Sequence, residues 1–203
     1  MARPRQFDEA AVLDAAVQCF WSRGYEVTSV RELAEGMGLT SASLYNAFGD
    51  KRALYRRSLE HYLEQSVRDR IRRFEGLSPR DAVAAFLGEI VERSMGDLEC
   101  RGCMLVNAAL EIAPHDPEFR LVVAEELRQI EAFFRRCVSR GQKSGEISAA
   151  VDAKDAARML LGVLMGIRVL ARARPERALL EGIVRPALGL LDPPARPPGQ
   201  LAH

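Results

Sequence analysis

Apolar residues recur at helical spacing through most of the chain. Val30, Leu33, Ala34 and Met37 form one such series, at positions i, i+3, i+4 and i+7, which places them on one face of a helix. The alternation of apolar and polar residues that is typical of strands appears nowhere. The pattern therefore predicts an all-α fold.

Glycine, proline and capping residues divide this pattern into separate helices. We expect helices near residues 8–23, 29–36, 40–48, 50–74, 79–95, 102–113, 117–141, 152–171 and 176–191. Ser29 and Glu32 match the capping box, and Pro79 stands at a first helical position. We expect three parts, namely an amino-terminal domain, a carboxy-terminal helical domain and a proline-rich disordered tail, at residues 1–52, 53–191 and 192–203.

Two of the expected helices are short and are joined by a glycine turn. In the second of them, Leu44 and Phe48 face inward, which leaves a polar face outside. That face consists of Thr40, Ser41, Ser43, Tyr45 and Asn46. Small hydroxyls, an amide and a tyrosine suit a DNA groove. Helix pairs with glycine turns also occur in proteins that bind no DNA, so spacing alone leaves both interpretations open.

Composition and charge exclude only a few classes of protein. The chain has 203 residues, of which 48% are hydrophobic, so it can bury one or two cores. No apolar block is long enough to span a bilayer, and the first residues contain no apolar signal segment, so we expect a cytoplasmic protein without a membrane partner. The formal net charge is +1, so a basic face for DNA must be local. The basic residues that are candidates for this face are Arg3, Arg5, Lys51, Arg52, Arg56 and Arg57, although Arg3 and Arg5 also suit a solvated tail.

The segment from about residue 7 to residue 55 resembles the amino-terminal domain of the tetracycline-repressor (TetR) family of bacterial transcription regulators. The residues that carry this resemblance are Ala15, Phe20, Gly24, Tyr25, Thr28, Ser29, Val30, Arg31, Leu33, Ala34, Gly38, Leu39, Ser43, Leu44, Tyr45, Phe48, Lys51 and Leu54. The resemblance implies a three-helix domain with a helix-turn-helix that reads double-stranded operator DNA.

Roles for individual residues follow from the same resemblance. It implies phosphate contacts for Thr28 and Tyr45, a backbone contact for Lys51, and a base contact, to guanine above all, for Arg31. The groove-facing positions are Thr40, Ser41 and Ser43. At Asn46 and Ala47 the chain departs from the aromatic or histidine pair of many members, and Asn46 is suited to pair with adenine instead.

The run ARMLLGVLMGIRVLA near the carboxyl end is apolar on nearly every side. A helix of this kind must be covered on two sides, and it is too short to span a membrane, so we expect a second subunit to cover it. The expected interface residues are Gly162, Met165, Gly166, Val169, Ile183 and Ala187. The resemblance implies a four-helix homodimer interface, and a dimer matches a palindromic operator.

Family resemblance also implies that a small-molecule effector binds the carboxy-terminal helices and releases the DNA. Candidate lining residues are Phe86, Ile90, Met104, Asn107, Leu110, Glu111, Phe119 and Phe134. Asn107 and Glu111 lie four residues apart in an apolar stretch, and buried polar groups need partners. A hydrogen bond to a neighbouring helix and a contact with a ligand both explain them.

Four cysteines and three histidines offer little other chemistry. Cys100 and Cys103 form a C-x-x-C motif, for which buried packing, a redox-sensing thiol switch and half of a metal site are the alternatives. The chain lacks G-x-S-x-G, H-E-x-x-H and P-loop motifs, so we expect no catalysis, cofactor or metal. The predicted function is a DNA-binding transcriptional regulator, in the common mode of the family a repressor. A helical adaptor that binds protein is the other interpretation.

Overall fold

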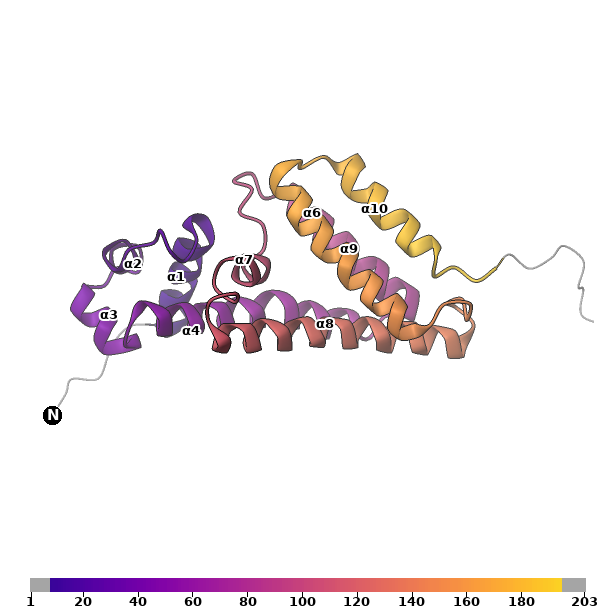
Figure 1. The fold of residues 1–203 in the computed structure, drawn as a ribbon, viewed down its shortest axis with the longest axis horizontal. Helices are drawn as coiled ribbons and strands as arrows, with labels where there is room; N and C mark the ends of the chain where they lie inside the picture. The colour runs from indigo at the N-terminus through magenta and orange to yellow at the C-terminus, as the bar shows by residue number, and fades with distance from the viewer. Residues whose placement is uncertain (1–7, 195–203) are drawn as a thin grey trace, which may run out of the picture. The chain divides into compact units, whose positions relative to one another are not determined.

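The computed structural model describes residues 8–194, and helices joined by turns make up this part of the chain (Figure 1). The helices are α1 (Glu9–Arg23), α2 (Val30–Gly36), α3 (Ser41–Phe48), α4 (Lys51–Leu63), η1 (Glu64–Arg68), α5 (Asp69–Phe74), α6 (Pro79–Met95), α7 (Met104–Glu111), α8 (Pro117–Ser144), α9 (Ala153–Ala173) and α10 (Arg177–Gly189). No strand occurs between residues 8 and 194. The predicted all-α class is confirmed.

Most helices begin where a short polar side chain caps the first turn. The Asp8 carboxylate accepts a hydrogen bond from the Ala10 amide at 3.0 Å, and the Asp152 carboxylate accepts one from the Lys154 amide at 2.9 Å. Such caps supply partners for backbone donors that a helix start leaves unpaired. These starts were predictable because the signal lies within a few residues of each helix end.

The long helix expected over residues 50–74 differs from the structure in its middle. A π-helical turn, η1 (Glu64–Arg68), separates α4 from α5. A π turn holds more residues than an α turn, so it changes which side chains face inward. The segment contains neither glycine nor proline, so the sequence carried no signal for this irregularity.

One compact unit contains residues 8–70 together with residues 97–127. Its core includes Phe20 of α1, Tyr55 of α4 and Phe119 of α8, with ring centroids 4.9 Å apart between Phe20 and Tyr55 and 5.4 Å apart between Tyr55 and Phe119. This unit does not coincide with the domain boundary expected at residue 52, because α7 and the start of α8 pack on the amino-terminal helices.

The other compact unit contains residues 71–96 and 128–194. Helices α6, α9 and α10 pack against one another in it (Figure 1). The Phe86 ring lies 5.2 Å from that of Phe133 and 5.1 Å from that of Phe134, centroid to centroid. Arg168 is buried and donates a hydrogen bond to the Ser94 hydroxyl at 3.2 Å.

Both ends of the chain lie outside the described residues. Arg3 and Arg5 of the expected basic arm are among them, as is the expected disordered tail from residue 195 onward. Asp192, at the start of that tail, is described and accepts a hydrogen bond from Arg80 at 2.6 Å. Between residues 8 and 194, no helix combines the length and the apolar character needed to cross a membrane.

Candidate nucleic-acid interface

Helix α2 is short, and its start is fixed by side chains. The Ser29 hydroxyl accepts a hydrogen bond from the Glu32 amide at 3.2 Å, while the Ser29 amide donates to the Glu32 carboxylate at 2.8 Å. This reciprocal pair is the predicted capping box. Leu33 and Ala34 face the core, so the opposite side of α2 is left to solvent.

A tight turn connects α2 to α3. Gly38 has a φ of 65°, in the left-handed region that favours glycine, and the Leu39 amide donates to the Ala34 carbonyl at 2.8 Å. Thr40 then caps α3, because its hydroxyl accepts a hydrogen bond from the Ser43 amide at 3.1 Å. The turn fixes the angle at which α3 leaves α2.

Helix α3 has one buried face and one exposed polar face. Leu44 and Phe48 are buried, as expected. The exposed residues of the opposite face are Thr40, Ser41, Ser43, Tyr45 and Asn46. Hydroxyl and amide groups on a rigidly capped helix are the groups that bind base edges and phosphates in a DNA groove.

Arg31 extends from the exposed side of α2. Its side chain is 86% exposed, and its Nε donates a hydrogen bond to the Glu35 carboxylate at 2.8 Å. The hydrogen bond to Glu35 raises the pKa of Arg31. Glu35 is not among the residues expected from the sequence, although its spacing of four residues from Arg31 is the signal for such a helical ion pair.

Lys51 lies at the start of α4, and its ammonium group is already engaged by the protein. Its Nζ donates to the Glu26 carbonyl at 3.1 Å and lies 4.6 Å from the centroid of the Tyr25 ring. The ammonium group therefore supports the turn between α1 and α2. Its partial exposure leaves room for the expected contact with a DNA phosphate.

Thr28 does not fit the phosphate contact that we expected of it. Its side chain is only 1% exposed, and its hydroxyl donates to the Gly24 carbonyl at 2.6 Å. A phosphate oxygen needs an accessible donor, so we remove Thr28 from the candidate interface.

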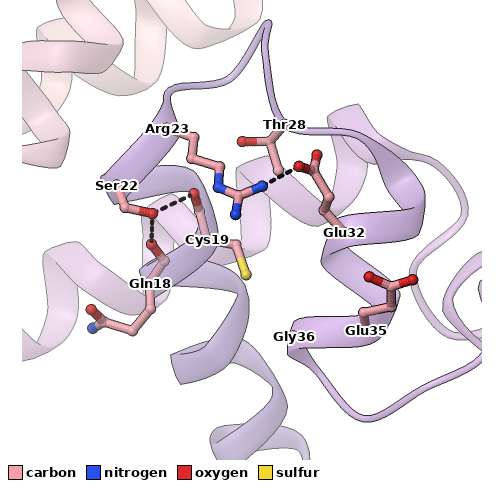
Figure 2. A pocket seen from close by; sticks show the side chains of 8 residues that line it. All are labelled: Gln18, Cys19, Ser22, Arg23, Thr28, Glu32, Glu35 and Gly36. Atoms are coloured by element: carbon pink, nitrogen blue, oxygen red, sulfur yellow. Dashed lines mark hydrogen bonds and ion pairs between the residues drawn. The ribbon is translucent and has the colours of Figure 1, made fainter.

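A cavity of about 350 Å³ lies between α1 and α2 (Figure 2). Arg23 and Glu32 form an ion pair across it, drawn as a dashed line in Figure 2. Gly36 lies directly over the Cys19 thiol, since a Cβ atom added at Gly36 would come within 2.6 Å of Cys19 Sγ. Burial raises the pKa of this thiol.

The eight candidate effector residues are distributed over both compact units. Phe86, Ile90 and Phe134 belong to the unit with α6, and all three are buried. The members in the other unit are Met104, Asn107, Leu110, Glu111 and Phe119. The Asn107 side-chain amide donates to the Arg101 carbonyl at 3.0 Å, so its partner lies in the segment just before its own helix and not in a neighbouring helix.

Two of these candidates are used differently from our expectation. Leu110 is 63% exposed, so it does not line an interior site. The Glu111 carboxylate accepts a hydrogen bond from the Tyr25 amide at 3.2 Å, which is a contact with the turn between α1 and α2. No local sequence signal indicates this contact, because 86 residues separate the two partners.

Five of the six expected dimer residues lie on an incompletely covered face of α9 and α10. Val169 is 49% exposed, and a Cβ atom added at Gly162 or Gly166 would meet nothing within 4 Å. Met165 and Ile183 are partly exposed. Ala187 is different, because it is only 5% exposed and packs inside its own unit. We therefore exclude Ala187 from the expected interface.

Cys100 and Cys103 precede α7. Cys103 is buried and accepts a hydrogen bond from the Tyr62 hydroxyl at 3.5 Å, and Cys100 has a φ of 51°. Within the described residues, no group of three or more histidine, cysteine, aspartate or glutamate side chains is arranged to hold a metal ion.

Comparison with known families matches both parts of the chain. Residues 12–57 match the model described as "Bacterial regulatory proteins, tetR family". Residues 79–185 match the model described as "Tetracyclin repressor-like, C-terminal domain". The first match contains the capped helix pair described above.

Individual relatives agree with these matches. An uncharacterized HTH-type transcriptional regulator of Bacillus subtilis, YezE, is 29% identical over 95% of this chain and 100% of its own. The HTH-type transcriptional repressor ComR of Escherichia coli is 28% identical over 90% of this chain and 87% of its own. Among solved structures, the TetR-family transcriptional regulator CifR, complexed with 26-base-pair operator DNA, is 38% identical, with a TM-score of 0.81 over 92% of this chain and 98% of that one.

Proposed function

This chain belongs to the tetracycline-repressor (TetR) family of bacterial transcriptional regulators, and on that premise we propose that it is a repressor that binds palindromic operator DNA as a homodimer. It is a DNA-binding regulator; the repressor mode is supported by relatives that are named repressors. The single observation that carries the proposal is the exposed polar face of α3, held by the Thr40 cap and the Gly38 turn.

Helix α3 enters the major groove in this proposal, as the second helix of a helix-turn-helix does. Ser41, Ser43 and Asn46 contact base edges, and Thr40 lies at the end of the helix that meets the DNA. Tyr45 and Lys51 contact phosphates on either side of the groove. Arg31 reads a base from α2, for which it exchanges its bond with Glu35 for one with guanine.

The homodimer forms through the incompletely covered face of α9 and α10. Gly162 and Gly166 permit close approach of a partner helix, and Met165, Val169 and Ile183 supply apolar area. A two-fold axis then sets two copies of α3 about 34 Å apart, which is one turn of DNA. Operator DNA is cytoplasmic in bacteria, so the proposal places the protein there.

A small molecule releases the DNA in this proposal. The effector binds among the carboxy-terminal helices and favours a conformation in which the two copies of α2 and α3 in the dimer no longer match the operator. The candidate lining residues that we retain for this site are Phe86, Ile90 and Phe134, which are buried in the compact unit that contains α6. The relatives described above are named as DNA-binding regulators, which does not favour an adaptor or a thiol-based sensor using Cys100 and Cys103.

The test begins with fragments of the source genome that the purified protein selects, followed by binding measurements on the selected operator at several salt concentrations. Affinity should fall steeply as salt rises, because phosphate contacts release counterions. Tyr45→Phe should weaken binding to every sequence about equally, by roughly tenfold, since a hydrogen bond to a charged group is lost.

Base contacts give a different result from phosphate contacts. Arg31→Ala and Ser41→Ala should change the order of preference among operator variants, at a cost of about 1–3 kcal/mol for a lost bidentate arginine contact. Binding that responds to neither Tyr45→Phe nor Arg31→Ala would show that α2 and α3 do not read the DNA.

A further inference from the structure

The turn between α1 and α2 determines where the reading helices begin. Gly24 has a φ of 86° and starts this turn. The Thr28 hydroxyl donates to the Gly24 carbonyl at 2.6 Å, one residue before the Ser29 cap of α2. The Tyr25 ring lies 4.9 Å from the Tyr55 ring, centroid to centroid. A displacement of this turn therefore moves the first residue of α2.

A carboxylate from a distant part of the sequence binds this turn. Glu111 is the last residue of α7, and one of its oxygens accepts a hydrogen bond from the Tyr25 amide at 3.2 Å. This hydrogen bond also requires that Gly24 has no side chain, because a Cβ atom added there would lie 3.1 Å from the same Glu111 oxygen. The close approach thus depends on a glycine in the turn and on an acid in α7.

The position of this acid is unfavourable for α7 itself. A helix carries partial negative charge at its carboxyl end, so an anionic last residue destabilises an isolated helix. Glu111 nonetheless occupies that end, and the Tyr25 amide is its hydrogen-bond partner from another element. A bond from a backbone amide to an ionised carboxylate is stronger than a bond between neutral groups.

Lys51 binds a second backbone group of the same turn. Its ammonium group donates to the Glu26 carbonyl at 3.1 Å. The turn is therefore held by an anion from α7 at the Tyr25 amide and by a cation from α4 at the Glu26 carbonyl. Together with the Thr28 hydroxyl, these groups restrain successive backbone groups from residue 24 to residue 26.

We infer that Glu111 is a positioning residue for DNA binding: its carboxylate fixes the turn between α1 and α2 and thereby the placement of α2 and α3 for operator recognition. The inference rests on the proposed role of α2 and α3 as the reading helices. It extends the DNA-binding machinery to α7, outside residues 12–57 that match the amino-terminal family model.

Neighbouring contacts make the inference testable, because they hold α7 in place without Glu111. Arg52 donates to Asp116 at 2.7 Å and to Glu118 at 2.6 Å, just after α7. The Asn107 side chain adds a bond within the same segment. Removal of the Glu111 carboxylate should therefore loosen the turn and leave the chain folded.

The experiment compares Glu111→Ala and Glu111→Gln in the full-length protein, with the operator selected by the unaltered protein as the probe. Glu111→Ala should lower operator affinity roughly tenfold, as expected for a lost hydrogen bond to a charged group. Glu111→Gln should recover most of this affinity, because its amide oxygen can accept the same bond. Hydrogen exchange at the Tyr25 amide should be faster in Glu111→Ala than in the other two proteins. Glu99→Gln, which removes an exposed carboxylate from the segment before α7, should bind as the unaltered protein does.

Unchanged affinity in Glu111→Ala, or an equal loss in both Glu111 variants, overturns the inference. If Glu111→Ala unfolds, Glu111→Asp decides instead, because its carboxylate is one methylene shorter and no longer reaches the Tyr25 amide: faster exchange of that amide with weaker operator binding supports the inference, and faster exchange with unchanged affinity overturns it. Failure of the proposed function looks different, because Tyr45→Phe and Arg31→Ala would then bind the operator normally as well.

Discussion

At the scale of single residues, Gly36 occupies a position with no room for a side chain. The Cys19 thiol of α1 fills the space in which a Cβ atom would lie (Figure 2). Contact between α1 and α2 at this point depends on glycine in one helix and on a small residue in the other. A side chain at position 36 would therefore have to push the thiol or the helices apart at this point.

We predict that Gly36→Ala destabilises the protein by about 1–3 kcal/mol, the usual cost of overpacking. The sign of this stability change is informative, because alanine in place of glycine in a helix otherwise stabilises the protein by up to about 1 kcal/mol. The double variant Cys19→Ala, Gly36→Ala should regain the lost stability in urea unfolding. A stabilised Gly36→Ala variant would show that the thiol moves aside freely.

Glu35 is a second residue whose role is local. Its carboxylate holds Arg31 through a 2.8 Å hydrogen bond on the face that we propose meets the DNA. The negative charge of Glu35 repels DNA phosphates and so opposes non-specific binding. Arg31 exchanges its bond with Glu35 for a bond with DNA only where a suitable base lies within reach.

We predict that Glu35→Gln strengthens binding to random DNA and reduces the preference for the operator. With Arg31 released to a phosphate, the slope of log affinity against log salt should steepen by about 0.9 per protomer. The measurement is a salt titration on operator and random duplexes in parallel. An unchanged ratio between the two duplexes would contradict a role for Glu35 in discrimination.

At the scale of elements, short helices depend on their ends. Helix α2 has seven residues, too few to be stable alone, so its capping box and its packing on the core carry it. Removal of a cap should affect α2 more than it would affect a long helix.

We predict that Ser29→Ala lowers the free energy of unfolding by about 1 kcal/mol, the typical cost of a lost serine cap. Ser22→Ala is a matched control, because Ser22 lies on α1 and its hydroxyl bonds only to carbonyls of its own helix. That variant should remain within about 0.5 kcal/mol of the unaltered protein. Chemical denaturation measures both, and equal effects would mean that the capping box does not stabilise α2.

The start of α8 provides a prediction for pH. The Arg52 guanidinium beside Asp116, together with backbone amides, lowers the pKa of that carboxyl from 3.8 to about 2. A lowered pKa in the folded state contributes stability that is present above pH 3.8 and is lost as pH falls toward 2.

Asp116→Asn keeps a side-chain oxygen for the amides of Glu118 and Phe119 but removes the charge that pairs with Arg52. We predict a lower thermal midpoint for this variant at pH 7, and a difference from the unaltered protein that shrinks as pH falls from 4 toward 2. A difference that stays constant over that range would exclude the charge as its cause.

Local signals account for what the sequence predicted well. Capping residues such as Ser29, Thr40 and Asp152 act within three residues, and helical periodicity identified the buried faces of α2 and α3. Contacts between distant parts of the chain gave no such signal. The bond between Glu111 and Tyr25 and the burial of Thr28 depend on tertiary packing, which places a side chain by partners that periodicity does not reveal.

At the scale of the whole molecule, the proposed function requires two copies of the chain. We predict that Val169→Glu gives a monomer in analytical ultracentrifugation, because a charge on the exposed face of α9 opposes an apolar interface. Operator affinity should fall by about a hundredfold or more, since the two reading heads no longer bind together. Lys154→Glu, on the exposed first turn of α9, is the control and should remain a dimer. A dimeric Val169→Glu would place the interface elsewhere.

A hybrid regulator that joins the reading helices of this protein to the body of a relative would need more than one crossover. A graft of residues 12–57 alone would leave the Tyr25 amide and the Arg52 guanidinium facing whatever the relative has at positions 111 and 116. The compact unit that includes both partners combines residues up to 70 with residues 97–127. The unit that would have to be transferred is therefore encoded by two separate segments of the gene. A hybrid with the operator specificity of this protein must contain both segments.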